Sequence, residues 1–161
     1  HIQPSRFNQR TKKNMNLNIL YATVSGNAEM VAKKMQSLAL KRNFKVSLKE
    51  MNDYTLKTFN QLDNVAIITS TYGDGDVPEM GADFWQELKE SDVKLPNMKY
   101  GLIALGDKSH EHFCGAGKQV SKKLESLDCL KVIENLECDG DTEGTFEWSI
   151  KFLDKLKDDK V

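Results

Sequence analysis

The chain has 161 residues, 39 % of them hydrophobic and 29 % charged, a composition that suits one globular domain with a sizeable core. Its formal net charge is −1, but residues 15–161 hold 19 basic and 24 acidic side chains and carry −5, so we expect no nucleic-acid partner. No apolar run is long enough for a membrane span or a signal-peptide core, and three cysteines argue against a disulfide framework, so the sequence predicts a soluble, cytoplasmic protein that does not bind membranes.

Residues 1–14 differ from the rest of the chain. They contain four basic residues, no acidic residue and no apolar periodicity. We interpret residues 1–14 as a tag scar or flexible leader and residues 15–161 as one folded domain.

Strands and helices alternate from residue 17 onward. Continuous apolar runs at 17–22, 65–68 and 100–105 predict strands that are buried on both faces. Alternating runs at 44–48 and 131–136 predict strands at the edges of the same sheet. The fold class is therefore α/β, a doubly wound five-stranded parallel sheet in the order 2-1-3-4-5 with helices on both faces.

The helices between these strands are predicted from apolar residues at helical spacing, which we expect to face the core. The stripes are Phe84/Trp85/Leu88, Phe146/Ile150/Leu153, Val120/Leu124/Leu127 and Val31/Met35/Leu38/Ala39. In a sheet of this order a ligand binds outside the carboxyl ends of the first and third strands, within reach of the loop after the fourth.

The loop after the first strand has the composition of a phosphate socket. It reads Thr23-Val24-Ser25-Gly26-Asn27-Ala28 and runs directly into a helix, whose free N–H groups and dipole attract an anion. It contains no Lys or Arg, so a nucleoside triphosphate with magnesium is not expected. The loop predicts a site for a phosphate monoester; an ordinary helix cap is the alternative.

The loop after the third strand combines two glycines with an aromatic residue and carboxylates. It includes Ser70, Thr71, Tyr72, Gly73, Asp74 and Gly75. We expect Tyr72 to offer its ring to a flat ligand, with a tyrosine packed on the sheet as the alternative. Asp74, Asp76 and Glu79 lack the regular register of a calcium loop, so we interpret them as a solvated acidic rim and predict no metal site.

The loop after the fourth strand forms the third wall of the predicted crevice. It runs through Leu105, Gly106, Asp107, His110, His112, Phe113 and Cys114 into another helix. The two histidines and the cysteine superficially resemble metal ligands or a nucleophile with its base, but no further ligand cluster and no carboxylate at a recognisable orienting spacing accompanies them. We expect the loop to present an aromatic ring and backbone N–H groups to a planar ligand.

Together the three loops resemble the flavodoxin-like FMN-binding family. Residues 23–29 are similar to the phosphate loop of short-chain flavodoxins and of the FMN domains of diflavin reductases, and residues 70–76 are similar to their first flavin loop. Residues 105–114 resemble the second flavin loop, most closely that of the sulfite reductase flavoprotein and of the short flavodoxins called MioC. The match covers nearly all of the chain from Met15.

The resemblance implies FMN as the cofactor and assigns residues to it. Tyr72 stacks on one face of the flavin, the Gly73 carbonyl meets the flavin N5 proton, and His110 stands where the family usually has a second stacking tyrosine. Asp139 or Asp141 lines the ribityl side. The implied cofactor-binding set is Thr23, Val24, Ser25, Gly26, Asn27, Ala28, Ser70, Thr71, Tyr72, Gly73, Asp74, Gly75, Leu105, Gly106, Asp107, His110, His112, Phe113 and Cys114.

The function implied by the resemblance is a monomeric carrier of single electrons with no substrate turnover of its own. An NAD(P)H-dependent flavin reductase is the expected donor, and acceptor redox enzymes with basic faces suit the acidic loops. One alternative is an excised FMN domain of a diflavin reductase; another is a flavin-dependent NAD(P)H quinone reductase. We discount a receiver-type signalling domain because Ser70 and Thr71 occupy the place of its phosphorylated aspartate.

Overall fold

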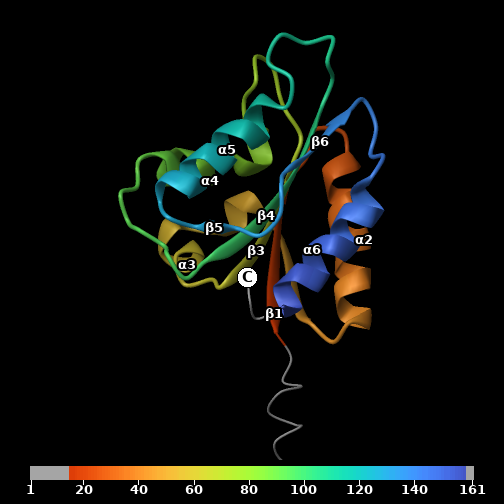
Figure 1. Ribbon diagram of the computed structural model, residues 1–161. Helices are drawn as coiled ribbons and strands as arrows, with labels where there is room; N and C mark the ends of the chain where they lie inside the picture. The colour runs from red at the N-terminus through yellow and green to blue at the C-terminus, as the bar shows by residue number, and fades with distance from the viewer. Residues whose placement is uncertain (1–14, 159–161) are drawn as a thin grey trace, which may run out of the picture.

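A computed structural model describes residues 15–158, so the predicted leader at 1–14 lies outside the described residues. In this part of the chain six strands form one parallel sheet (Figure 1). The order β2-β1-β3-β4-β5 confirms the predicted topology, and β6 pairs with β4 beyond β5. The strands are β1 (Asn16–Ala22), β2 (Lys45–Glu50), β3 (Asn64–Thr69), β4 (Lys99–Gly106), β5 (Leu130–Lys131) and β6 (Leu136–Asp139).

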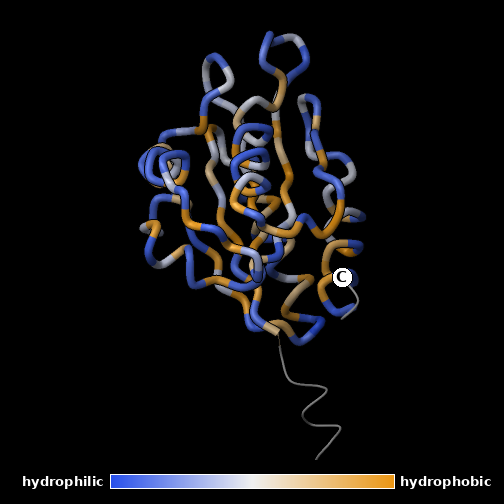
Figure 2. The backbone as a smooth tube through the Cα atoms, turned by 60° about the vertical axis from the view of Figure 1, so that its left-hand side comes forward, coloured by the Kyte–Doolittle hydropathy of each residue, from blue (hydrophilic) through white to orange (hydrophobic). Residues whose placement is uncertain are grey.

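Helices cover both faces of the sheet and enclose a separate apolar core on each side (Figures 1 and 2). On one face lie α2 (Asn27–Lys41) and α6 (Thr145–Lys157). On the other lie α4 (Glu79–Lys89) and α5 (Gly115–Ser126), with the short η1 (Met51–Asp53) and α3 (Leu56–Phe59). None of the helices in residues 15–158 combines the length and apolarity that a membrane crossing requires.

Burial explains the two kinds of strand pattern. Every residue of β3 is buried and all residues of β4 between its two ends are buried, because helices pack on both faces. In β2, at the edge of the sheet, no residue is fully buried. The continuous patterns therefore identified central strands correctly, and the alternating pattern at 44–48 identified an edge strand.

The prediction of one strand at 131–136 is wrong, because the fifth strand is interrupted. Tyr100 of β4 pairs with Lys131, whereas Ile103 pairs with Leu136, so the edge strand contains two residues more than β4 over this interval. Neighbouring helices hold the interruption: Trp148 Nε1 donates to the Glu134 carbonyl at 2.8 Å, and Asn135 Nδ2 donates to Ser121 Oγ at 3.0 Å. Side chains remote in sequence thus divide the strand.

One predicted core stripe is right only at Leu153, which is fully buried. Phe146 is 55 % exposed, and the buried apolar face of α6 is formed by Trp148, Phe152, Leu153 and Leu156. The reason lies in the sheet, where a Cβ atom at Gly101 would lie 2.5 Å from the Phe152 ring. Glycine at this position lets the stacked Trp148 and Phe152 rings, 5.1 Å apart between centroids, approach the strand.

Candidate functional site

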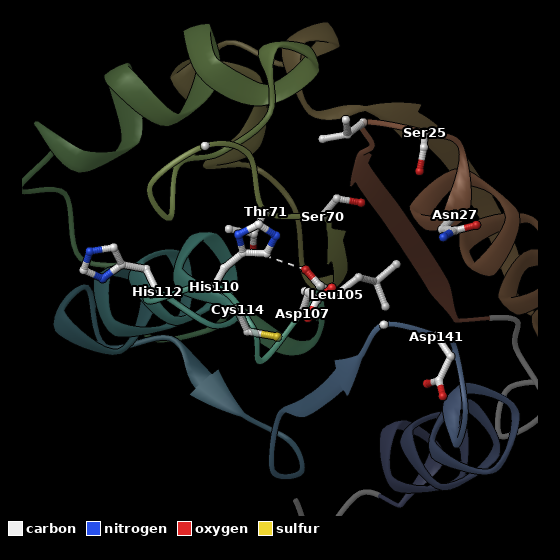
Figure 3. Close-up of a pocket in the computed structure, with 14 residues that line it drawn as sticks. Ser25, Asn27, Ser70, Thr71, Leu105, Asp107, His110, His112, Cys114 and Asp141 are labelled. Carbon is white, nitrogen blue, oxygen red and sulfur yellow. Dashed lines mark hydrogen bonds between the residues drawn. The ribbon is translucent and has the colours of Figure 1, made fainter.

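Loops that follow β1, β3 and β4 meet at one edge of the sheet and enclose a cavity of about 350 Å³ (Figure 3). This volume lies within the usual range of small-molecule pockets, about 300–1,000 Å³. Most of the predicted set lines the cavity: Val24, Ser25, Asn27, Ser70, Thr71, Gly73, Leu105, Gly106, Asp107, His110, His112 and Cys114. The predicted residues outside the lining are Thr23, Gly26, Ala28, Tyr72, Asp74, Gly75 and Phe113.

The first loop is organised from within by Thr23. Its buried Oγ1 atom accepts hydrogen bonds from the amides of Gly26 at 2.8 Å and Ala28 at 3.3 Å. Gly26 caps α2 with a φ of +98°, a conformation that favours glycine. Within residues 15–158 the amides of Ser25 and Asn27 have no acceptor, so N–H donors at the start of a 15-residue helix remain free for an anion.

The second loop is a tight turn that rests on the third. The backbones of Tyr72 and Asp76 exchange two hydrogen bonds of 2.8 Å, and Gly73 and Gly75 adopt φ values of +54° and +97°. The Gly75 carbonyl accepts from Gln119 Nε2 of α5 at 2.7 Å. Tyr72 is 59 % exposed, so its ring is not packed on the sheet and is open to a ligand or a partner.

The third loop is fixed by carboxylates. Asp107 Oδ1 accepts the amide of Ser109, and Asp139 Oδ1 at the end of β6 accepts the amide of Lys108, each at 2.8 Å. His110 donates its amide to the Asp107 carbonyl at 3.0 Å. The hydrogen bond from Ser109 lowers the pKa of the Asp107 carboxyl, so this acceptor is ionised at neutral pH.

The two histidines and Cys114 do not form a catalytic group. Burial raises the pKa of the Cys114 thiol to about 12, and its Sγ contacts the Ala104 carbonyl at 3.5 Å. Both histidines are exposed, and His112 packs against Gly75, where an added Cβ atom would lie 2.8 Å from the His112 Cβ. Cys114 therefore joins the third loop to the sheet, and His110 remains as a ring on the cavity wall.

Phe113 does not line the cavity, and its ring packs on the outer side of the loop. Its half-buried ring lies under the ammonium groups of Lys108 and Lys118, at 5.6 and 5.3 Å from the ring centroid. Cation–π contacts of this kind stabilise the outer side of the loop. The expectation that Phe113 touches the cofactor stays a prediction.

A fourth segment completes the cavity with Gly140 and Asp141, which follow β6. Asp141 was expected from the family resemblance alone, and Gly140 was missed. The available signal was a Gly-Asp pair directly after the last strand of a parallel sheet, because the carboxyl ends of such strands meet at one edge.

Comparison with known proteins gives three concordant results. The family model described as flavodoxin matches residues 19–152. The sulfite reductase [NADPH] flavoprotein alpha-components of Photobacterium profundum and Vibrio vulnificus are 36 % and 35 % identical over 144 residues, which are 88 % of this chain. The chain spans only about a quarter of the length of these relatives, 24 % and 23 %.

The matches to solved structures extend over nearly the full length of those chains. A flavodoxin from Streptococcus pneumoniae TIGR4 matches with a TM-score of 0.79 and 26 % identity, over 91 % of this chain and 99 % of that one. A point mutant of a Pseudomonas aeruginosa flavodoxin matches with a TM-score of 0.78 and 26 % identity, over 89 % and 99 %.

Proposed function

The chain belongs to the flavodoxin family, and we propose that it carries single electrons, by means of FMN, from a reductase to an acceptor protein. Bound FMN supplies the redox chemistry, because it accepts and releases electrons one at a time. The protein binds the cofactor, orients it and presents one edge to partners. The three free cysteines, all buried, fit a reducing compartment such as the cytoplasm.

The phosphate end of the site carries this proposal. The free amides of Ser25 and Asn27, the left-handed Gly26 and the positive end of the α2 dipole suit a phosphate monoester held without a cationic side chain. Thr23 supports them by holding two neighbouring amides to its hydroxyl. The donor set thus fits the terminal phosphate of FMN.

The ring end fits a planar group. Backbone from Leu105 to Asp107 forms one wall, and Thr71 Oγ1 donates to the Leu105 carbonyl at 3.2 Å, which joins the second and third loops. Tyr72 and His110 are exposed aromatic rings on these two loops. They are the side chains available to cover the two faces of a flavin.

Exposed carboxylates surround this edge and point to the kind of partner. They lie on the second and third loops and on the segment after β6: Asp74, Asp76, Asp107, Glu111, Asp139, Asp141 and Glu143. A rim of one sign attracts partners with basic faces, and their association slows as salt is added. We propose an NAD(P)H-dependent flavin reductase as the donor and a basic-faced redox enzyme as the acceptor.

The first experiment is to add FMN to the purified protein, desalt it, and titrate it anaerobically with dithionite. We expect one retained FMN per chain and reduction in two separate one-electron steps. Ser25→Ala and Asn27→Ala remove the side-chain donors, Ser25 Oγ and Asn27 Nδ2, that lie beside the free amides on the cavity wall. These variants should weaken FMN binding and leave riboflavin binding unchanged. Loss of FMN from the wild-type protein on desalting, with no saturable binding at micromolar concentration, contradicts the proposal.

A second candidate is supported by the curated relatives described above, because 88 % of the chain matches a segment of much longer sulfite reductase flavoproteins. In that case the domain acts as the FMN domain of a diflavin reductase. Reduction of the FMN-loaded protein by a separate NADPH-dependent flavin reductase distinguishes the two roles, since a free carrier accepts electrons at rates that rise with donor concentration. Oxidation of NADH with a quinone by the protein alone would instead indicate a quinone reductase.

A further inference from the structure

In the part of the chain that the structure describes, the tip of the third loop, residues 107–110, has one backbone hydrogen bond to another strand. Among the backbone groups of residues 107–110, and within residues 15–158, only the Lys108 amide is bonded to a different element, namely Asp139 of β6. We propose that Asp139 is a positioning residue that sets the conformation of the third loop and so organises the ring end of the cofactor site. This inference rests on the proposed binding of FMN.

Cys114 joins the far end of the third loop to the sheet, but the bonds within residues 107–110 do not hold the tip of the loop there. The amides of Ser109 and His110 are bonded to Asp107, which belongs to the same tip, so these bonds shape the turn without fixing its direction. The Asp139 carboxylate adds a bond from outside, and a charged acceptor makes it stronger than a bond between neutral groups. The bond therefore ties residue 108, two residues ahead of His110, to the end of β6.

The interruption of the fifth strand explains why Asp139 is available. In β6 the register pairs Gly106 with Asp139, 33 residues apart, whereas β5 pairs Tyr100 with Lys131, 31 residues apart. Without the two additional residues Gly106 would face Glu137. A shift of two residues keeps each side chain on the same face of the sheet, so the interruption exchanges one carboxylate for another without disturbing the core.

Two further observations agree with this role. Gly140 donates its amide to the Gly106 carbonyl at 2.7 Å, so the pairing of β6 with β4 continues to the base of the third loop. Glu137, which would face Gly106 without the two additional residues, has its Oε1 atom 4.0 Å from the Lys118 ammonium on α5. The interruption itself is held by Trp148 and Asn135, as described above.

The test compares Asp139→Ala with a matched removal of charge, Glu143→Ala. Glu143 is an exposed carboxylate on the segment after β6, and it does not line the cavity. Hydrogen exchange of the Lys108 amide is measured by NMR in the FMN-free proteins. We expect exchange at least tenfold faster in Asp139→Ala and unchanged in Glu143→Ala.

Binding supplies the second readout. Asp139→Ala should raise the Kd of FMN and of riboflavin by the same factor, about tenfold, because the ring end is loosened and the phosphate loop is untouched. Asp139→Asn, which keeps an acceptor oxygen, should stay within about threefold of the wild type. Asp139→Ser, whose side chain is too short to reach, should repeat the effect of alanine and serves as the second variant if alanine affects folding.

Three results would overturn the inference: unchanged Lys108 exchange in both Asp139→Ala and Asp139→Ser, a change in Kd for FMN but not for riboflavin, or an equal loss in Glu143→Ala. The last result would mean that charge at the rim, and not the hydrogen bond, controls binding. If the wild-type protein binds neither FMN nor riboflavin, the proposed function fails, whereas the exchange of the Lys108 amide still decides whether Asp139 holds the loop.

Discussion

Gly75 is the position where the contact between the second and third loops is least tolerant of change. In Gly75→Ala the φ of +97° becomes a left-handed conformation of an L-residue, which costs about 1–2 kcal/mol. The new Cβ atom would also lie 2.8 Å from the Cβ of His112. That atom is next to the His112 backbone and cannot rotate away, so overpacking adds about 1–3 kcal/mol. We expect a loss of unfolding free energy of about 2–5 kcal/mol.

Two other glycines provide matched controls. Gly73 lies in the same loop with a φ of +54°, and an added Cβ atom there meets only Asp76 Oδ2 at 3.8 Å. Gly140 has a φ of +74° and no atom within 4 Å of such a Cβ. Gly73→Ala and Gly140→Ala therefore carry the strain of a left-handed residue without the clash, and each should lose about 1–2 kcal/mol.

The assay is urea unfolding of the FMN-free proteins, with the midpoint and slope fitted for each variant. FMN binding by the folded variants is then measured, and Gly75→Ala should show the weakest binding because the second loop can no longer rest on His112. The reasoning is refuted if Gly75→Ala loses no more stability than Gly73→Ala, since the close contact between the two loops would then be absent.

Three further predictions concern the core and the site. Burial raises the pKa of Tyr100 from 10.0 to about 12 and those of the three cysteine thiols from 9.0 to about 11 or 12. The folded protein thus keeps these four protons to higher pH than the unfolded chain does, so their contribution to stability is complete below pH 9 and is lost as the pH rises toward 12. The urea concentration at the midpoint of unfolding should therefore fall between pH 8 and pH 12, and a constant midpoint would contradict this prediction. Thr23→Val leaves the Gly26 and Ala28 amides without an acceptor, which should lower the unfolding free energy by about 1–3 kcal/mol and weaken FMN but not riboflavin binding. His110→Tyr enlarges the ring on the cavity wall and should tighten FMN binding about three- to tenfold in a fluorescence titration; an unchanged Kd would show that His110 does not stack on the flavin.

The sheet could be predicted from sequence because its central strands are buried on both faces and therefore read as continuous apolar runs. The interruption after Lys131 could not, since it depends on hydrogen bonds from Trp148 and Asn135, and neither side chain carries a local signal for a break in a strand. The misplaced core face of α6 has a similar cause. Phe146 fits a helical stripe, but Gly101 on a distant strand decides which rings can approach the sheet.

The site shows the same division between local and remote causes. Loop composition predicted most of the cavity wall, because hydroxyl groups, glycines and a helix start are local features. It did not reveal that Thr23 turns inward to its own loop, nor that Gly140 joins the wall. The first is a contact within the loop, where composition does not tell whether a hydroxyl faces the cavity or the loop's own amides. The second depends on the register of β6 beside β4, which decides which of the residues after the last strand reaches the wall.

The charge of the protein is divided in a way that fits electron transfer. Helices α2 and α6 contain six basic and three acidic side chains, a net charge of +3, although residues 15–161 as a whole carry −5. The rest of residues 15–161 therefore carries a net charge of −8. The first loop, at the start of α2, offers an anion only neutral donors and a helix dipole, so it adds no positive side chain to this negative excess. Under the proposed function, the negative potential then remains available to attract a basic partner. A cation in the first loop would weaken the field that we propose guides the partner, and the loop contains neither Lys nor Arg.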